Sequence, residues 1–267
     1  MRDDQHSELH QRLARGDALL VQQNPHAAIV SYRDGLALAR QHLLADEQSP
    51  AALRAVSVSL NRVGDACQLL RDHDEAQRVH AEALAIARRL LESGGASLEA
   101  VTDVTTGLER LGDSLVSLER FRDAADAYQE SLDLHDGLIK TYGQSLKTMR
   151  GYAVSVHKIG GILAIFGRSE KAAGAYQEGL KLSRWILTTY GESAASLRDV
   201  IVSLGELALL AENQDDPRGA LDYFEQALGP AERLVAIAGD DPWPASFLTW
   251  ATESIDRLRA ATRETAP

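Results

Sequence analysis

A spacing of 48 residues recurs along this chain in three separate registers. The first register holds glycine four times and then alanine. The second holds only alanine, and the third holds aromatic residues with one histidine. The members are Gly16, Gly64, Gly112, Gly160 and Ala208; Ala28, Ala76, Ala124, Ala172 and Ala220; and Tyr32, His80, Tyr128, Tyr176 and Phe224. A fixed period of tens of residues is typical of repeat proteins, whose units stack and share one continuous core.

Residues 49–96 show how one repeat is built. Ser49 before Pro50 predicts a helix start, because serine can cap the first turn and proline at the first helical position loses no hydrogen bond. Apolar residues then recur at alternating spacings of three and four, as they do on one face of a helix. After a turn near 71–73, a second apolar stripe ends at Gly95, which can take the left-handed conformation that closes a helix. Each repeat is therefore expected to be a pair of antiparallel helices.

Small residues and one proline lead to further expectations. Gly64 and Ala76 are expected to form the closest approach between the two helices of a repeat, with the aromatic register filling the wider gap one turn along. Pro230 falls within the second helix of the fifth repeat, where we expect it to kink or interrupt that helix.

The order of these small and aromatic residues resembles the tetratricopeptide repeat, a helix-turn-helix unit. Glycine is followed by alanine twelve residues later, by an aromatic residue or histidine after four more, and by a small residue after three more. The matches are Gly64, Ala76, His80 and Ala83; Gly112, Ala124, Tyr128 and Ser131; and Gly160, Ala172, Tyr176 and Gly179. The usual unit has about 34 residues, so the chain is similar to long-repeat bacterial arrays of this family, with helices of roughly 20 residues.

The resemblance implies an all-α fold. We expect a right-handed α-solenoid of about five antiparallel helix pairs, forming one domain over residues 1–263. A C-terminal capping helix is expected to cover the open end of the stack. The repeats fall at about 1–47, 48–95, 96–143, 144–191 and 192–239, and the capping helix at 242–263.

Charge and cysteine content narrow the functional classes. The net charge is −11 at pH 7, which argues against a nucleic-acid partner bound by phosphate neutralisation. Cys67 is the single cysteine, so no intrachain disulfide is expected, and its place on the apolar stripe predicts a buried, inert thiol. Neither a signal peptide nor a long apolar run is recognisable. We expect a cytoplasmic protein with no membrane partner, no metal and no cofactor.

The candidate binding residues follow from the resemblance. In that family the first helix of each pair lines a concave groove, and residues near the glycine face into it. Here these residues are Asn61, Arg62, Asp65, Glu109, Arg110, Asp113, His157, Lys158 and Gly161, and two turns upstream Arg54, Arg150 and Arg198 form a column that contains Thr102. Arginine can hold a carboxylate in a bidentate fork, which favours an acidic or C-terminal peptide. The alternative is that the arginines pair with nearby carboxylates of the chain on a solvated face.

Trp185 breaks the pattern, because its register otherwise holds Gln41, Arg89, Gly137 and Arg233. Two interpretations stay open: a contact with a partner or a second copy of the chain, or packing against a helix of its own chain.

Catalytic motifs are missing, so we expect no enzymatic activity. The sequence predicts a non-enzymatic scaffold that binds a partner protein or peptide, and the alternatives are a sensor of a small ligand or peptide signal and a homo-oligomerising adaptor.

Overall fold

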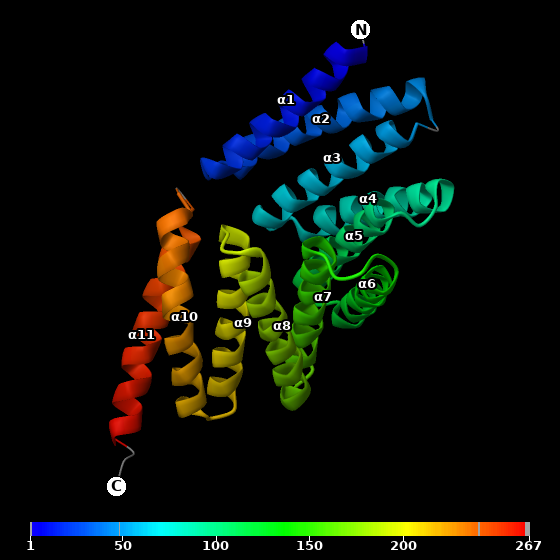
Figure 1. The fold of residues 1–267 in the computed structure, drawn as a ribbon. Helices are drawn as coiled ribbons and strands as arrows, with labels where there is room; N and C mark the ends of the chain where they lie inside the picture. The colour runs from blue at the N-terminus through cyan, green and yellow to red at the C-terminus, as the bar shows by residue number, and fades with distance from the viewer. Residues whose placement is uncertain (1, 48, 240, 265–267) are drawn as a thin grey trace. The chain divides into compact units, whose positions relative to one another are not determined.

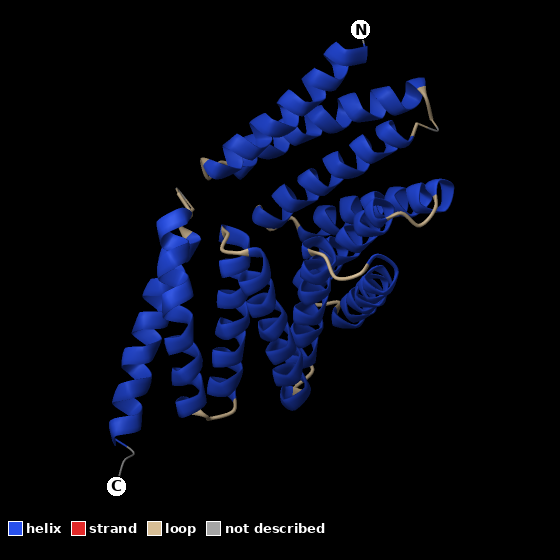
Figure 2. Cartoon of the chain, in the orientation of Figure 1, coloured by secondary structure: helices blue, strands red, loops and turns tan. Residues whose placement is uncertain are grey.

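The computed structural model describes residues 2–47, 49–239 and 241–264, and these residues form eleven α-helices and no strand (Figure 2). They belong to two compact units, Met1–Leu138 and Ile139–Pro267. Unit 1 contains α1 (Arg2–Val21), α2 (Pro25–Ala45), α3 (Pro50–Leu69), α4 (His73–Gly94), α5 (Leu98–Ser117) and most of α6 (Phe121–Tyr142). Unit 2 contains α7 (Leu146–Ile165), α8 (Ser169–Tyr190), α9 (Ala194–Asn213), α10 (Pro217–Ile237) and α11 (Trp243–Glu264).

The 48-residue period sets the helix positions. First helices of successive pairs begin at Pro50, Leu98, Leu146 and Ala194, and second helices begin at His73, Phe121, Ser169 and Pro217. Helices that follow one another in the chain, seen in order in Figure 1, pack together within each unit. Five helix pairs and a C-terminal helix are therefore confirmed, whereas the description as one domain over 1–263 stays a prediction.

Capping side chains explain where the helices begin. Asn24, Ser49, Asp72, Ser97 and Asp216 each accept a hydrogen bond from the backbone N–H three residues later. A cap of this kind satisfies one of the free N–H groups of the first turn. The loop serines that precede α7 and α9 go further, because each forms a reciprocal capping box. The cap expected at Ser49 is thus confirmed.

The turn inside each pair has a feature that the sequence did not reveal. One residue there has a positive φ in every pair, and it is glycine in only one of them. The five residues, again 48 apart, are Gln23 (55°), Arg71 (59°), Glu119 (57°), Gly167 (69°) and Asp215 (58°). Positive φ costs a residue other than glycine free energy, so this turn geometry is imposed by the packing of the two helices.

The glycine register makes room for the aromatic register. A Cβ atom built on Gly112 would lie 2.3 Å from the ring of Tyr128, and one on Gly64 would lie 2.1 Å from His80. Real Cβ atoms do not approach other heavy atoms so closely. The expectation that the aromatic residue fills a separate gap, one turn away from the glycine, is therefore wrong: the ring rests directly on the glycine.

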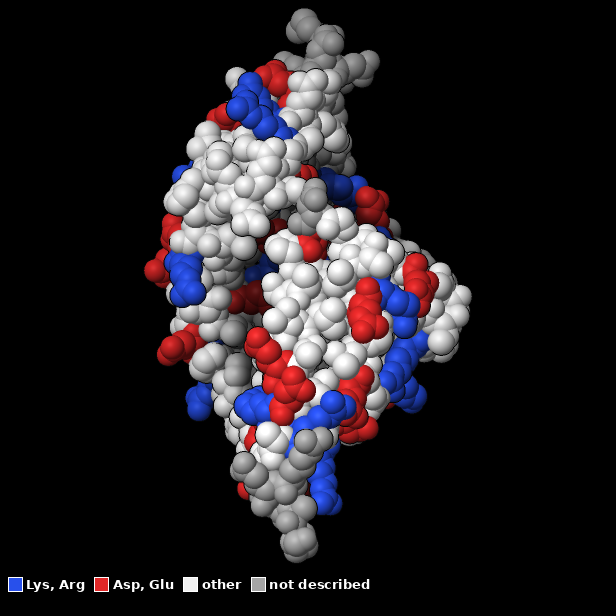
Figure 3. Space-filling view, turned by 90° about the vertical axis from the view of Figure 1, so that its left-hand side faces the viewer, with Lys and Arg blue, Asp and Glu red and all other residues white. Residues whose placement is uncertain are grey.

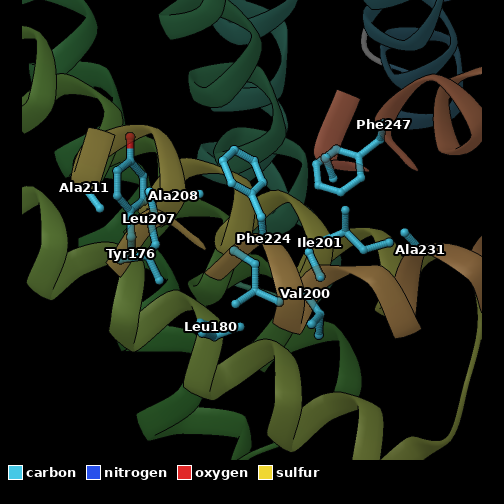
Figure 4. Close-up of a cluster of buried hydrophobic side chains, with 14 of the residues drawn as sticks. Tyr176, Leu180, Val200, Ile201, Leu207, Ala208, Ala211, Phe224, Ala231 and Phe247 are labelled. Carbon is cyan, nitrogen blue, oxygen red and sulfur yellow. The ribbon is translucent and has the colours of Figure 1, made fainter. Parts of the chain in front are cut away.

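Unit 2 has the larger of the two main cores (Figure 4). Phe224 from α10 is fully buried in a cluster with Val200 and Ile201 of α9, and Phe247 of α11 belongs to the same cluster. α10 runs from Pro217 to Ile237 as one helix, so the interruption expected at Pro230 is wrong, whereas the kink expected there as the alternative stays a prediction. The C-terminal helix covers this core as expected, with Phe247, Ala251, Ile255 and Leu258 buried against it.

Candidate interaction surface

The structure distributes the predicted binding residues over both units. In unit 1, α3 and α5 contact each other, and we call the surface that they share the α3–α5 face. It carries Arg54, Asn61, Arg62 and Asp65 from α3 and Glu109, Arg110 and Asp113 from α5, all of them half-buried. Unit 2 holds Arg150, His157 and Lys158 on α7, Trp185 on α8 and Arg198 on α9.

Every arginine of the α3–α5 face pairs with a carboxylate of the chain. Arg54 Nε lies 3.0 Å from Asp103 Oδ2 and its Nη1 3.0 Å from Glu99 Oε1. Arg110 Nε lies 2.9 Å from Asp65 Oδ1. Arg62 reaches back to Asp17 of the first pair. These bonds join side chains 45 to 49 positions apart, so they connect neighbouring repeats.

Unit 2 repeats this pairing. Arg150 Nε lies 3.0 Å from Asp199 Oδ2, at the same offset as Arg54 and Asp103. Burial nevertheless outweighs the arginine and raises the pKa of Asp199. Arg198 pairs with Asp241, and its guanidinium lies 4.4 Å from the centre of the Trp243 ring. The arginine column is therefore arranged as the ion-pair alternative describes it.

A small cavity of about 210 Å³ opens on the α3–α5 face. Asn61 is exceptional among its lining residues, because its side-chain Oδ1 is buried and has no hydrogen-bond partner among the residues that the structure describes. Buried polar atoms are paired in most structures, and an orphaned acceptor costs about 1–3 kcal/mol. The cavity is lined by Arg54, Ser57, Val58, Asn61, Arg62, Asp103, Thr106 and Arg110.

A histidine takes the place of tyrosine beside this face. Tyr128 donates to Asp113 Oδ1 at 2.6 Å and Tyr32 donates to Asp17 Oδ1 at 2.7 Å. In the intervening repeat, His80 Nε2 lies 3.5 Å from Asp65 Oδ1. Burial alone would raise the pKa of Asp65, but the nearby His80 and Arg110 outweigh it and hold that pKa below its ordinary value.

The second ring nitrogen of His80 contacts a serine of the next repeat. Nδ1 lies 2.8 Å from Ser114 Oγ, and Ser114 Oγ in turn donates to the carbonyl oxygen of Arg110 at 3.1 Å. The positions 48 residues away from Ser114 hold Ala66 and Ile162. The serine therefore accompanies the histidine, a signal that comparison of the repeats could have found.

Two other acidic residues of the α3–α5 face contact the second helix of their own pair. Glu109 Oε1 accepts a hydrogen bond from Ser131 at 3.1 Å and lies 3.5 Å from His135 Nε2. Asp113 accepts the Tyr128 hydroxyl and raises the pKa of that tyrosine further than burial alone does. Both carboxylates thus serve the packing of α6.

His157 in unit 2 is a neutral group at neutral pH. Its ring centre lies 5.1 Å from that of Tyr176. Burial, with a smaller effect from Lys158, lowers the pKa of His157 to about 4. Gly161 stands where the tyrosine's aspartate would be, and Tyr176 instead forms a hydrogen bond with Glu206, whose pKa is raised by burial.

Trp185 packs within its own unit. It lies against a cluster that includes Met149 and Ile186, and its ring meets that of Tyr190 edge-on with centres 5.8 Å apart. These contacts match the interpretation in which the indole packs against its own chain. Cys67, also as predicted, is fully buried, and burial raises its pKa to about 11.

Charged residues of both signs are interspersed on the face seen in Figure 3, with no large area of one sign. No group of three or more His, Cys, Asp or Glu side chains within the described ranges could hold a metal ion. Of the helices that the structure describes, none has the length and apolar character needed to span a bilayer.

The paired helices and their repeated glycine–aromatic contacts define a helical-repeat protein with the architecture of tetratricopeptide repeats. No protein-family model matches the chain, and no curated protein matches its sequence. The likeness is therefore one of fold.

Solved structures share this fold. BtubC (BKLC) from P. vanneervenii is 19% identical with a TM-score of 0.60, over 91% of this chain and 94% of that one. A putative kinesin light chain from Podosopora anserina, with nearly identical TPR-like repeats, is 14% identical with a TM-score of 0.58, over 85% and 96%. A Rap protein complexed with Competence and Sporulation Factor is 12% identical with a TM-score of 0.63, over 94% of this chain but only 65% of that one.

Proposed function

We propose that the chain is a non-enzymatic interaction scaffold and that the α3–α5 face of unit 1 binds an extended peptide segment of a partner protein. The observation that carries the proposal is that Asn61 lines the cavity of that face and that its buried Oδ1 has no hydrogen-bond partner in the described part of the chain. An amide oxygen accepts a backbone N–H, which every peptide except proline supplies. A Rap protein that shares this fold forms a complex with a factor, which supports binding as the mode of action.

The ion pairs of the arginines change how a peptide is expected to bind to the α3–α5 face. Arg54, Arg62 and Arg110 already hold carboxylates of the chain, so an acidic peptide gains affinity only by exchanging one carboxylate for another. Recognition of the peptide backbone by Asn61 needs no such exchange. It requires only that side chains lining the cavity shift, and such rotamer changes are common on binding. In unit 2, we propose that four further residues take part in binding the peptide: Arg150, His157, Lys158 and Arg198.

Selection from a random peptide library displayed on phage tests the proposal. An enriched peptide, labelled with a fluorophore, is expected to bind the whole chain and to lose at least about tenfold in affinity with Asn61→Ala, the loss of one buried hydrogen bond. Arg62→Glu is expected to weaken binding as well, because Arg62 lines the same cavity. Arg122→Glu makes the same charge change on an exposed position of α6 and is expected to have no effect. Equal affinity of Asn61→Ala and the wild type would exclude this face as the binding site.

A further inference from the structure

A second and larger hollow, of about 570 Å³, lies in unit 1 where the start of α3, the end of α4 and the start of α5 meet. Its floor is apolar, since Leu53, Leu90 and Ala100 line it and are each only 5% exposed. Arg54 and Arg89 line it as well. Sites that bind organic ligands have volumes of about 300–1,000 Å³, mainly apolar walls and a few polar groups.

In unit 2, aromatic side chains stand at the positions that correspond to this hollow. α7 and α8 have the same lengths as α3 and α4, 20 and 22 residues, and begin 96 positions later. By this offset, the floor residues Leu53 and Leu90 correspond to Met149 and Ile186. Arg89 corresponds to Trp185 and Gly94 to Tyr190, so an indole and a phenol stand in unit 2 where unit 1 has a guanidinium and a hydrogen atom.

In unit 2 the floor is covered by Trp185, and Tyr190 lies against the ring of that tryptophan. Trp185 packs against the cluster of Met149 and Ile186, and Tyr190 meets it edge-on. In unit 1 the space is open, because a Cβ atom built on Gly94 would have nothing within 4 Å. The same floor is thus covered by the chain's own Trp185 in one unit and left uncovered in the other.

The charges around the hollow complement the face of an aromatic ring. Asp103 and Glu99 hold Arg54 in position. Arg89 is exposed and has no ion-pair partner among the residues described, whereas Arg233, in the same register, lies 2.8 Å from Glu192. A guanidinium attracts the electron-rich face of tryptophan or tyrosine, and the apolar floor takes the rest of the ring.

We propose that this hollow receives a tryptophan or tyrosine side chain of a partner polypeptide. The aromatic pair of unit 2 supplies the shape of the occupant, and the guanidinium of Arg89, which no described carboxylate pairs, supplies the electrostatic attraction. The proposal does not depend on the peptide site of the α3–α5 face, because the Asn61 cavity is a separate one and shares only Arg54 with this hollow.

The test uses N-acetyl-tryptophanamide as the probe and the whole chain as the target, with binding followed by saturation-transfer NMR of the probe. The wild type is expected to bind it, and to bind N-acetyl-leucinamide at least tenfold more weakly. The double variant Arg89→Trp, Gly94→Tyr reproduces the side chains of unit 2, and we expect it to bind the probe at least tenfold more weakly than the wild type. Arg122→Trp adds an exposed indole elsewhere and is expected to bind like the wild type.

Arg89→Ala keeps the hollow open and removes one cation. We expect its affinity for the probe to fall about two- to fivefold, as for an exposed cation–π contact.

A wild type that does not bind the probe, or a double variant that binds it as well as the wild type, would overturn the proposal. So would displacement of the probe by equimolar acetate, which would indicate a simple anion site. A wild-type dimer that the double variant abolishes would instead assign the hollow to a second copy. The phage-selected peptide is expected to bind the double variant normally, so this proposal and the peptide site can fail separately.

Discussion

At the scale of single residues, contact between glycine and a ring is the unit on which each helix pair is built. The ring of Tyr128 packs directly on Gly112, and the tyrosine hydroxyl donates a hydrogen bond to Asp113 on the same helix as the glycine. Packing and hydrogen bonding are therefore coupled, because a displaced ring also loses its acceptor. His80 and Ser114 show that the ring can be exchanged when a new hydrogen-bond partner accompanies it.

Gly112→Ala is expected to destabilise the protein by about 1–3 kcal/mol, because the added methyl group forces Tyr128 off its site in a packed core. The measurement is the midpoint of urea unfolding followed by circular dichroism. Gly137→Ala is the matched control, since Gly137 also lies within a helix but a Cβ atom there meets nothing within 4 Å. The control is expected to gain up to about 1 kcal/mol from the better helix propensity of alanine. Equal effects of the two changes would contradict the role given to the ring.

His157 is expected to make unit 2 sensitive to acid. The pKa of His157 is about 4 in the folded protein and about 6.5 in an unfolded chain. Between these values the unfolded state binds the proton and the folded state does not, so stability is lost as the pH falls from about 7 to 4. Urea midpoints at pH 7 and pH 5 are expected to differ less in His157→Gln than in the wild type. His26→Gln, a change at an exposed histidine, is expected to leave the wild-type difference unaltered.

The sequence predicted which residues gather on the α3–α5 face but not how they pair. Arg54 could have met a solvent-exposed partner or Asp103, and spacing along the chain does not decide between them. Comparison of the repeats would have helped, because Arg54 with Asp103 and Arg150 with Asp199 share one offset of 49 residues. The orphaned Asn61 oxygen depends on the positions of all its neighbours, so no sequence pattern marks it.

At the scale of helices, local chemistry determines the bounds. The capping residues Ser49 and Ser97 stand directly before α3 and α5, which is why these starts were predictable. The turn between paired helices was not, because Arg71 and Glu119 have no intrinsic preference for the positive φ that they adopt. The interruption expected at Pro230 was wrong for a related reason: packing of α10 against α9 and α11 maintains the helix across a residue that opposes it.

Pro230→Ala is therefore expected to stabilise α10, because it restores one backbone donor and removes the clash of the ring with the preceding turn. Proline inside a helix costs about 3 kcal/mol or more, and we expect a gain of about 1–3 kcal/mol. Slower hydrogen exchange of α10 amides, measured by mass spectrometry, would reveal it. Pro217→Ala changes the first position of the same helix, where proline is tolerated, and should have little effect. Faster exchange in Pro230→Ala would show that the proline has a stabilising contact.

At the scale of the whole molecule, a stack of repeats leaves an apolar surface at its last helix pair, which a capping helix must cover. The period predicted every pair, but it gave no signal for the division between Leu138 and Ile139, because α6 continues through it. In unit 2 the last pair is covered by α11, whose sequence departs from the period. Phe247 reaches Gly205 of α9, where a Cβ atom would lie 3.2 Å from its ring, so glycine again makes room for an aromatic residue.

Ala251→Asp tests whether α11 keeps the molecule monodisperse. Ala251 is fully buried against α9 and α10, and a carboxylate there has no partner within the described part of the core. The expected cost exceeds about 2 kcal/mol, enough to detach α11 and expose Phe224 and Ile201. Because exposed apolar surface at the end of a repeat stack drives association, sedimentation velocity is expected to show concentration-dependent oligomers. Ala245→Asp makes the same change at an exposed position of α11 and is expected to sediment like the wild type. If Ala251→Asp also did so, the C-terminal helix would be an appendage to the fold instead of its cap.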